Sequence, residues 1–161
     1  MIKILKRYNI GDVQLLISDL LRKASVSSEV RQVAIEAAGG SDDPIASVYD
    51  WMRQHVSYIS DPVSDTGNIE LITSPVLMAK NYAAGNKLAE DCDGIAVFTT
   101  ALYRAIGIRS NVVLLDRNGN GYSHAVSQAY SVKFGRFIMV DPSTNEIPLG
   151  FDIAHVKKII I

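Results

Sequence analysis

The spacing of apolar residues changes near Gly107, and this change limits the possible folds more than any other feature of the chain. Before Gly107, apolar residues recur every three or four positions, as on one face of a helix, within residues 13–21, 30–37, 45–56, 76–84 and 95–106. After Gly107, β-branched or alternating segments cover residues 108–115, 123–133 and 137–140. Helices followed by an antiparallel meander of strands predict an α+β fold.

Capping and turn residues mark where the predicted elements begin and end. The candidate helix N-caps are Asp12, Ser27 or Ser28, Asp43, Ser74 and Asp91. Residues 118–121, Asn-Gly-Asn-Gly, predict a tight hairpin turn because both residue types tolerate positive φ. Residues 60–74 are rich in turn-forming types and predict an exposed loop that ends in a short apolar piece. The tail 155–161, HVKKIII, fits a last strand or a short helix equally well.

Length, charge and cysteine content narrow the class of protein. With 161 residues, of which 48% are hydrophobic and 20% charged, the chain is expected to fold as one globular domain over residues 1–161. A net charge of −1 provides no basic excess for binding nucleic acid, and no apolar run is long enough to span a membrane. The N-terminal stretch MIKILKRYNIGD lacks the apolar core and cleavage site of a secretory signal. A single cysteine needs no oxidising compartment, so a cytoplasmic protein is predicted.

Three residues lie at positions suited to nucleophilic catalysis. Cys92 begins the last predicted helix, where unpaired N–H groups and the helix dipole favour a thiolate. His124 lies near the start of the strand after the hairpin and could exchange a proton with the sulfur. Asp141 ends the next strand and could hold the imidazole through its other nitrogen. Asp91 and Asp93 flank the cysteine and disfavour a thiolate unless their carboxylates cap the helix.

Three segments resemble motifs of the transglutaminase-like superfamily. The superfamily's cysteine helix is similar to DCDGIAVFTTALYRAIGIRSNVV, its histidine strand to YSHAVSQAYSV, and its aspartate strand to FIMVDPST. The resemblance covers residues 45–145, which would form the core, and leaves residues 1–40 as a helical N-terminal extension. It implies a papain-like fold in which N-terminal helices and a core cysteine helix pack on an antiparallel sheet.

The resemblance also implies an activity. Cys92, His124 and Asp141 would form a Cys-His-Asp triad that acts on a peptide or carboxamide bond of a protein or peptide substrate, through a thioester and without a cofactor. The chain departs from the superfamily at residues 125–127, where an aromatic residue is common, and at Asp91, where glycine is usual. These departures and the small domain favour a bacterial or phage-type cysteine protease or amidase that hydrolyses its substrate over an enzyme that cross-links. They also motivate an alternative, a catalytically inactive interaction or assembly module of the same fold.

Weaker candidates could complete such a site. A tetrahedral intermediate needs hydrogen-bond donors for its oxyanion. The Cys92 backbone N–H and the Asn86 side-chain amide are the candidate donors. Trp51 and Tyr122 are candidates for lining the substrate site.

Metal binding and other histidines provide competing interpretations. A zinc ion held by Cys92, His124 and Asp141 stays open as an alternative, although no metal-ligand motif supports it and no metal is expected. Residues 116–121 resemble the start of a calcium loop, but the twelfth position is a serine instead of glutamate, so a hairpin turn is favoured. His55 and His155 are expected to be a packing residue and a surface residue.

Overall fold

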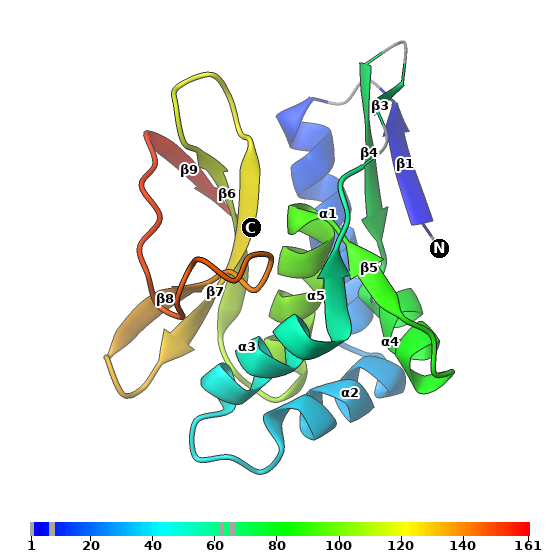
Figure 1. Ribbon diagram of the computed structural model, residues 1–161, viewed down its shortest axis with the longest axis vertical. Helices are drawn as coiled ribbons and strands as arrows, with labels where there is room; N and C mark the ends of the chain where they lie inside the picture. Colours follow the sequence, from blue (N-terminus) through cyan, green and yellow to red (C-terminus); the bar gives the residue numbers. More distant parts are fainter. Residues whose placement is uncertain (1, 7–8, 62, 65–66) are drawn as a thin grey trace.

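The computed structural model describes residues 2–6, 9–61, 63–64 and 67–161. Its helices are α1 (Ile10–Ala24), α2 (Ser28–Ala38), α3 (Pro44–His55), α4 (Pro75–Ala83) and α5 (Cys92–Ala105). Its strands are β1 (Ile2–Lys6), β2 (Val56–Tyr58), β3 (Val63–Ser64), β4 (Gly67–Thr73), β5 (Leu88–Glu90), β6 (Ser110–Asp116), β7 (His124–Ser131), β8 (Arg136–Val140) and β9 (Lys157–Ile160). Figure 1 shows the sheet of β6 to β9 on one side of the molecule and the helices beside it.

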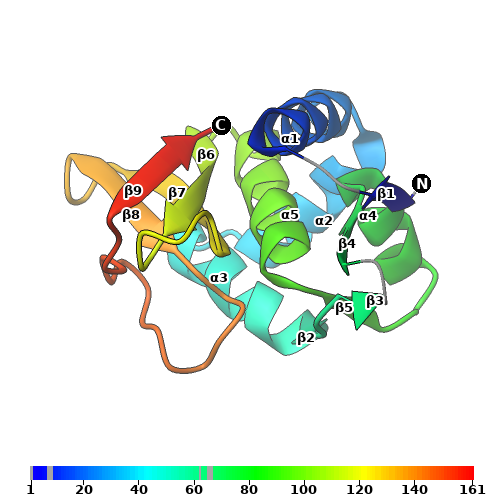
Figure 2. The same cartoon turned by 90° about the horizontal axis from the view of Figure 1, so that it is seen from above.

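Helix α5 forms the centre of the molecule. Every residue from Asp93 to Tyr103 is buried, so no side of the helix faces solvent over this length. A helix that is buried all round must be covered on every side; β7 covers one side, and α1 to α4 contact the others. Figure 2 shows α5 between the four-stranded sheet and the strands β1 and β4. The predicted packing of a cysteine helix on an antiparallel sheet is therefore confirmed.

The four-stranded sheet has the order β8-β7-β6-β9 and is antiparallel throughout. The predicted hairpin joins β6 to β7, and Asp116 Oδ1 accepts the backbone N–H groups of Asn118 and Gly119 in this turn. Between sheet and helix, the Thr100 hydroxyl of α5 donates to Ser127 Oγ of β7 over 2.8 Å. Because both groups are buried, this bond fixes the helix against β7 at one register.

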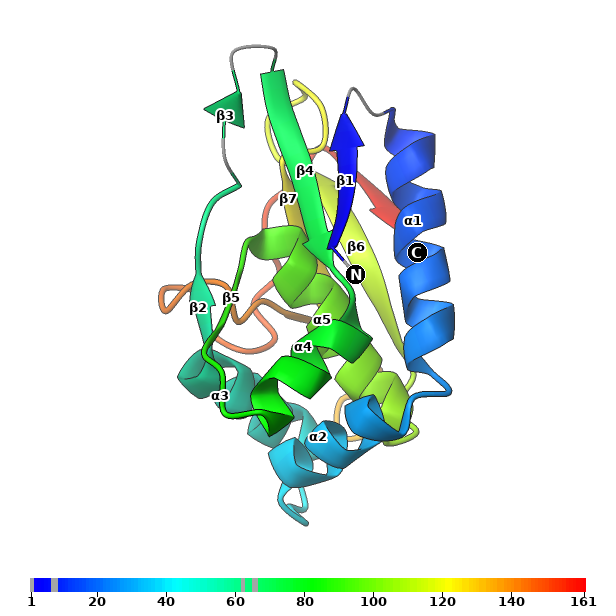
Figure 3. The ribbon, with the colours of Figure 1, turned by 90° about the vertical axis from the view of Figure 1, so that its right-hand side faces the viewer.

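The remaining strands differ from the sequence prediction. Residues 60–74, predicted as an exposed loop, contain β3 and β4, which form a sheet with β1 in the order β1-β4-β3. Residues 62, 65 and 66 of that prediction lie outside the described residues. No pattern predicted β1 or the parallel pair of β2 and β5. Figure 3 shows β2 and β5 side by side, with β5 leading into α5. The tail, which fitted a strand or a helix, forms β9 and pairs with β6.

The predicted N-caps are confirmed for α2 to α5. The capping side chains accept backbone N–H groups of the first helical turn; they are Ser27, Asp43, Ser74 and Asp91. The cap predicted for α1 is wrong, because Asn9 caps this helix. Asp12 lies at the third helical position and bonds back to the Asn9 backbone, which completes a capping box.

The first two helices contribute to the same hydrophobic core as the cysteine helix. Val13 and Leu21 of α1 and Val30 of α2 lie in one buried cluster with Phe98 of α5 and Val140 of β8. Burying this surface stabilises the fold by about 25 cal/mol per Å² of apolar area. Within the described ranges, no helix combines the length and apolar character that crossing a membrane requires.

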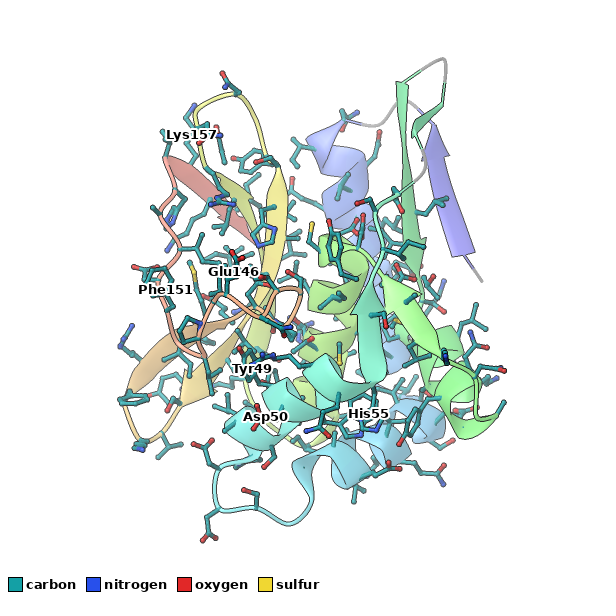
Figure 4. The ribbon with its side chains drawn as sticks, viewed as in Figure 1. Tyr49, Asp50, His55, Glu146, Phe151 and Lys157 are labelled. Carbon is teal, nitrogen blue, oxygen red and sulfur yellow. The ribbon has the colours of Figure 1, made fainter. Side chains whose placement is uncertain are left out.

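The segment between β8 and β9 lies across α3. The Tyr49 hydroxyl donates to the carbonyl oxygen of Ile147 over 2.8 Å, and the Arg53 guanidinium donates to the side chain of Asn145. Figure 4 shows Tyr49 on the side of α3 that faces this segment. These contacts hold the chain that directly follows Asp141.

Candidate active site

Cys92 is the first residue of α5, and β5 brings the chain to this point. The strand ends at Glu90, Asp91 caps the helix, and the backbone then turns into α5. The Cys92 side chain is half-buried, so it lies at the rim of the core. The first N–H groups of a helix have no acceptor within the helix. The Cys92 N–H and the partial positive charge of the helix end therefore both lie beside the thiol.

Asp91 and Asp93 direct carboxylate oxygens toward the helix N-terminus. Asp91 Oδ1 accepts the N–H of Gly94 over 3.4 Å, and Asp93 Oδ1 accepts the same N–H over 2.8 Å. Both residues are buried. The sequence left open whether these acids act on the thiol or cap the helix; Asp91 does cap the helix, and Asp93 binds the N–H of the residue that follows it.

His124 and Asp141 form a hydrogen-bonded pair in which Asp141 is buried and His124 is partly buried. His124 is the first residue of β7, and Asp141 directly follows β8, which pairs with β7. The distance from His124 Nε2 to Asp141 Oδ2 is 2.7 Å, and their side chains are 15% and 2% exposed. The other carboxylate oxygen of Asp141 accepts the backbone N–H and the hydroxyl of Ser143. These bonds fix the carboxylate, which in turn fixes the imidazole ring.

The charges of the pair follow from its surroundings. Burial acts to lower the pKa of His124, but hydrogen bonding with Asp141 and Cys92 outweighs it and raises this pKa to about 9. Burial acts to raise the pKa of Asp141, but His124 and Ser143 outweigh it and hold this pKa below its usual value. At neutral pH His124 is therefore an imidazolium beside a carboxylate. Since Nε2 binds Asp141, Nδ1 is the ring nitrogen left for Cys92.

Tyr58 is a site residue that the sequence did not indicate. It ends β2, next to the end of β5, and is 53% exposed. Burial of part of its ring and electrostatic interaction with Cys92, Asp91 and Asp93 raise the pKa of Tyr58, against a hydrogen bond with Ser60. The phenol therefore lies within electrostatic range of the cysteine. A strand of three residues is too short to show the alternation that could have predicted this position.

Glu90 is a second missed residue, a carboxyl group two positions before the cysteine. It is 6% exposed and lies against Gly94, where a Cβ atom would clash with the Glu90 carboxylate. Burial, reinforced by Asp91 and Asp61, raises the pKa of Glu90 to about 7, while a hydrogen bond with Thr73 opposes the rise. A side chain at position 94 would therefore require the buried Glu90 carboxylate to move.

The weaker candidates lie in three different environments. Tyr122 is exposed in the turn directly before β7, two residues from His124. Asn86 is exposed between α4 and β5, at the opposite end of β5 from Asp91, so the structure does not bring its amide to Cys92. Trp51 is 7% exposed and packs against α4 and α5, which leaves it almost no surface for lining a substrate site.

The other histidines and the glycine-rich turn are engaged in local contacts. His55 stacks on Trp51 with ring centroids 4.5 Å apart, and Figure 4 shows it on α3. His155 Nδ1 lies 2.7 Å from the carbonyl oxygen of Ile153 in the tail. The Asp116 side chain holds the hairpin turn that resembled a calcium loop. Within the part of the chain that the structure describes, no three His, Cys, Asp or Glu side chains gather in a way that could hold a metal ion.

Comparison by sequence finds no match for this chain. No family model matches it. A search of curated proteins finds no similar sequence.

Comparison by structure does find similar chains. A candidate cysteine protease from Cytophaga hutchinsonii superposes with a TM-score of 0.56 and 20% identity, over 98% of this chain and 53% of that one. A candidate protease from Parabacteroides distasonis superposes with a TM-score of 0.54 and 16% identity, over 78% of this chain and 25% of that one. LapG of Legionella pneumophila gives a TM-score of 0.48 at 15% identity, over 89% of this chain and 83% of that one.

These similarities concern the fold. The chain spans about half of the first structure and a quarter of the second, so what those whole proteins do is not carried over. The predicted α+β fold is confirmed, and the first two of these structures share it.

Proposed function

We propose that this chain is a thiol-dependent acyl-transfer enzyme in which Cys92 is the nucleophile, His124 the general acid and base, and Asp141 the residue that orients His124. One observation carries the proposal. The buried Asp141 carboxylate holds one nitrogen of His124 over 2.7 Å, while the same ring interacts with the thiol at the start of α5. A thiol at a helix N-terminus beside an imidazolium is the arrangement that favours a reactive thiolate.

The first half-reaction forms a thioester. The Cys92 sulfur attacks the substrate carbonyl carbon, a C–S bond forms, and the C=O π electrons move to the oxygen. When this intermediate collapses, the C–N bond breaks and the leaving amine takes the proton from His124. Asp141 keeps the ring in place during both steps and stabilises its positive charge.

The second half-reaction releases the product. Water attacks the thioester carbonyl while His124 accepts one of its protons, and the C–S bond then breaks to restore the thiolate. We favour water over an amine as the acceptor because the domain is small and none of the three residues directly after His124, residues 125–127, is aromatic. The substrate class is a peptide bond or a carboxamide of a protein. The thiol must stay reduced, so the cytoplasm is the location that suits this chemistry.

Acylation by p-nitrophenyl acetate tests the proposal without a known substrate. The native chain should release a stoichiometric burst of nitrophenolate at least about 10²-fold faster than the unfolded chain reacts. Cys92→Ala should abolish the burst, and His124→Ala should reduce its rate to that of the unfolded chain. His155→Ala, a matched change in the tail, should leave the burst unchanged.

If the chain is instead a catalytically inactive interaction module, the opposite result is expected. Its native thiol would react no faster than the thiol of the unfolded chain, and His124→Ala would have no effect. The acidic residues that flank Cys92 motivated this alternative, and the engagement of both carboxylates by the Gly94 N–H weakens it. Incubation with a mixture of peptides and a labelled amine then separates hydrolysis, which shortens peptides, from transfer, which attaches the label.

A further inference from the structure

The Tyr58 side chain projects from the face of β2 that is directed toward the interior of the protein. Strands β2 and β5 run parallel, with Val56 opposite Leu88 and Tyr58 opposite Glu90. Side chains alternate along a strand, so Tyr58 projects from the same face as Val56. Val56, Leu88 and Glu90 are all buried. The Tyr58 side chain is therefore directed toward the start of α5 and not away from it.

Tyr58 stays accessible because β2 ends at this residue. It is 53% exposed, in contrast to Val56 on the same face. The N–H of Ile59 donates to the carbonyl oxygen of Glu90 over 3.0 Å, which anchors the end of β2 beside the chain that leads into Cys92. The partly exposed phenol therefore lies at the end of β2, beside the chain that leads into Cys92.

The hydroxyl of Tyr58 is a hydrogen-bond donor at neutral pH. Partial burial and the interactions with Cys92, Asp91 and Asp93 raise the pKa of Tyr58 above its usual value of 10.0, although Ser60 acts in the other direction. The phenol therefore keeps its proton at neutral pH. A neutral donor in this place can stabilise a negative charge that develops beside the sulfur.

We infer that Tyr58 supplies the side-chain donor of the oxyanion hole, with the backbone N–H of Cys92 as its second donor. This inference rests on the acyl transfer proposed above. When the sulfur adds to a carbonyl, the π electrons that move to the oxygen would be shared by these two donors. Tyr58 keeps its proton throughout, so the step needs no further reactant. The sequence suggested Asn86 for this role, and Tyr58 takes its place.

Two reagents separate oxyanion stabilisation from thiol reactivity. Iodoacetamide alkylates the sulfur by displacing iodide and forms no oxyanion, whereas p-nitrophenyl acetate acylates it through a tetrahedral oxyanion. Tyr58→Phe should slow acylation by about 10- to 10²-fold and change the alkylation rate by less than about threefold. Tyr130→Phe is the matched control, because Tyr130 lies far along β7 from His124 with its ring beneath the Arg109 guanidinium. It should change neither rate.

The outcomes are distinguishable from one another. Unchanged acylation in Tyr58→Phe would overturn the inference, and so would equal slowing of both reactions, which would mean that Tyr58 acts on the thiol. A wild-type chain whose thiol acylates no faster than the unfolded chain refutes the proposed function itself, before any variant is compared. Trp51 fluorescence during thermal unfolding checks that Tyr58→Phe folds. If Tyr58→Phe does not fold, two other variants provide the same comparison: Tyr58→Leu has no hydrogen-bond donor, whereas Tyr58→His keeps one.

Discussion

Replacing Asp141 by Asn removes a buried negative charge from His124 while nearly keeping the shape of the side chain. The carboxylate is 2% exposed and lies 2.7 Å from Nε2 of the ring. Burial alone would lower the pKa of His124, yet hydrogen bonding with Asp141 and Cys92 raises it from 6.5 to about 9. The variant therefore tests how much of that rise the carboxylate supplies.

The size of the effect follows from this rise. An increase from 6.5 to about 9 favours the imidazolium by about 3 kcal/mol. Asp141 is one of the two groups responsible, so the loss of its charge should cost the imidazolium on the order of 1–2 kcal/mol, which is a roughly tenfold lower ratio of charged to neutral ring at a given pH. The titration midpoint of His124 in Asp141→Asn should therefore lie at least about one pH unit below that of the wild type.

Histidine-ring NMR measures this midpoint directly. The wild-type His124 resonances should titrate at about pH 9 and those of Asp141→Asn at a lower pH. Asp50→Asn removes the same charge from an exposed position on α3 and should leave the midpoint of His124 unchanged. A wild-type midpoint near 6.5, or equal midpoints in the wild type and Asp141→Asn, would refute the electrostatic account of the pair.

Three further changes test the packing around the site, with stability measured by urea unfolding and Trp51 fluorescence. The pKa of Glu90 is raised from 4.5 to about 7, so the free energy of unfolding of the wild type should fall as pH rises through this interval. Glu90→Gln should remove this fall and be more stable than the wild type by up to about 3 kcal/mol at pH values above 7. A wild-type stability that does not change with pH over this interval would contradict the reasoning. Gly94→Ala should destabilise the fold by about 1–3 kcal/mol because the new Cβ atom clashes with the Glu90 side chain. In a Glu90→Ala background the same Gly94→Ala change should cost less. An equal cost of Gly94→Ala in both backgrounds would exclude the clash. Thr100→Val leaves the Ser127 hydroxyl without its buried partner and should cost about 1–3 kcal/mol, whereas no loss would mean that the bond is dispensable.

Local signals in the sequence were sufficient for the helices and for strands β6 to β8 of the main sheet. The cysteine helix follows a capping aspartate and carries apolar residues on all sides, so its position and burial could both be predicted. The turn at 118–121 fixed the hairpin of β6 and β7. Because the predicted residues Cys92, His124 and Asp141 lie at the ends of neighbouring elements, their convergence also follows from the topology. Their roles in a reaction remain a proposal.

Features that depend on distant pairing could not be predicted. Strand β1 pairs with β4, from which it is separated in sequence by most of the N-terminal half of the chain. Strands β2 and β5 pair in parallel, although each has only three residues. Segments this short carry no readable period. Tyr58 comes near the cysteine only through this parallel pair, so sequence reasoning missed it. The same reasoning placed Trp51 at the site, because it could not distinguish a buried aromatic residue from one at the edge of a cleft.

The central claim is that folding turns Cys92 into a nucleophile by bringing it to His124 at the start of α5. Alkylation of Cys92 by iodoacetamide at about pH 6, followed by mass spectrometry in the native and the urea-unfolded chain, tests this claim most directly. We expect the native thiol to react at least about tenfold faster, because only the native state pairs it with an imidazolium. A native rate equal to or below that of the unfolded chain would contradict the claim.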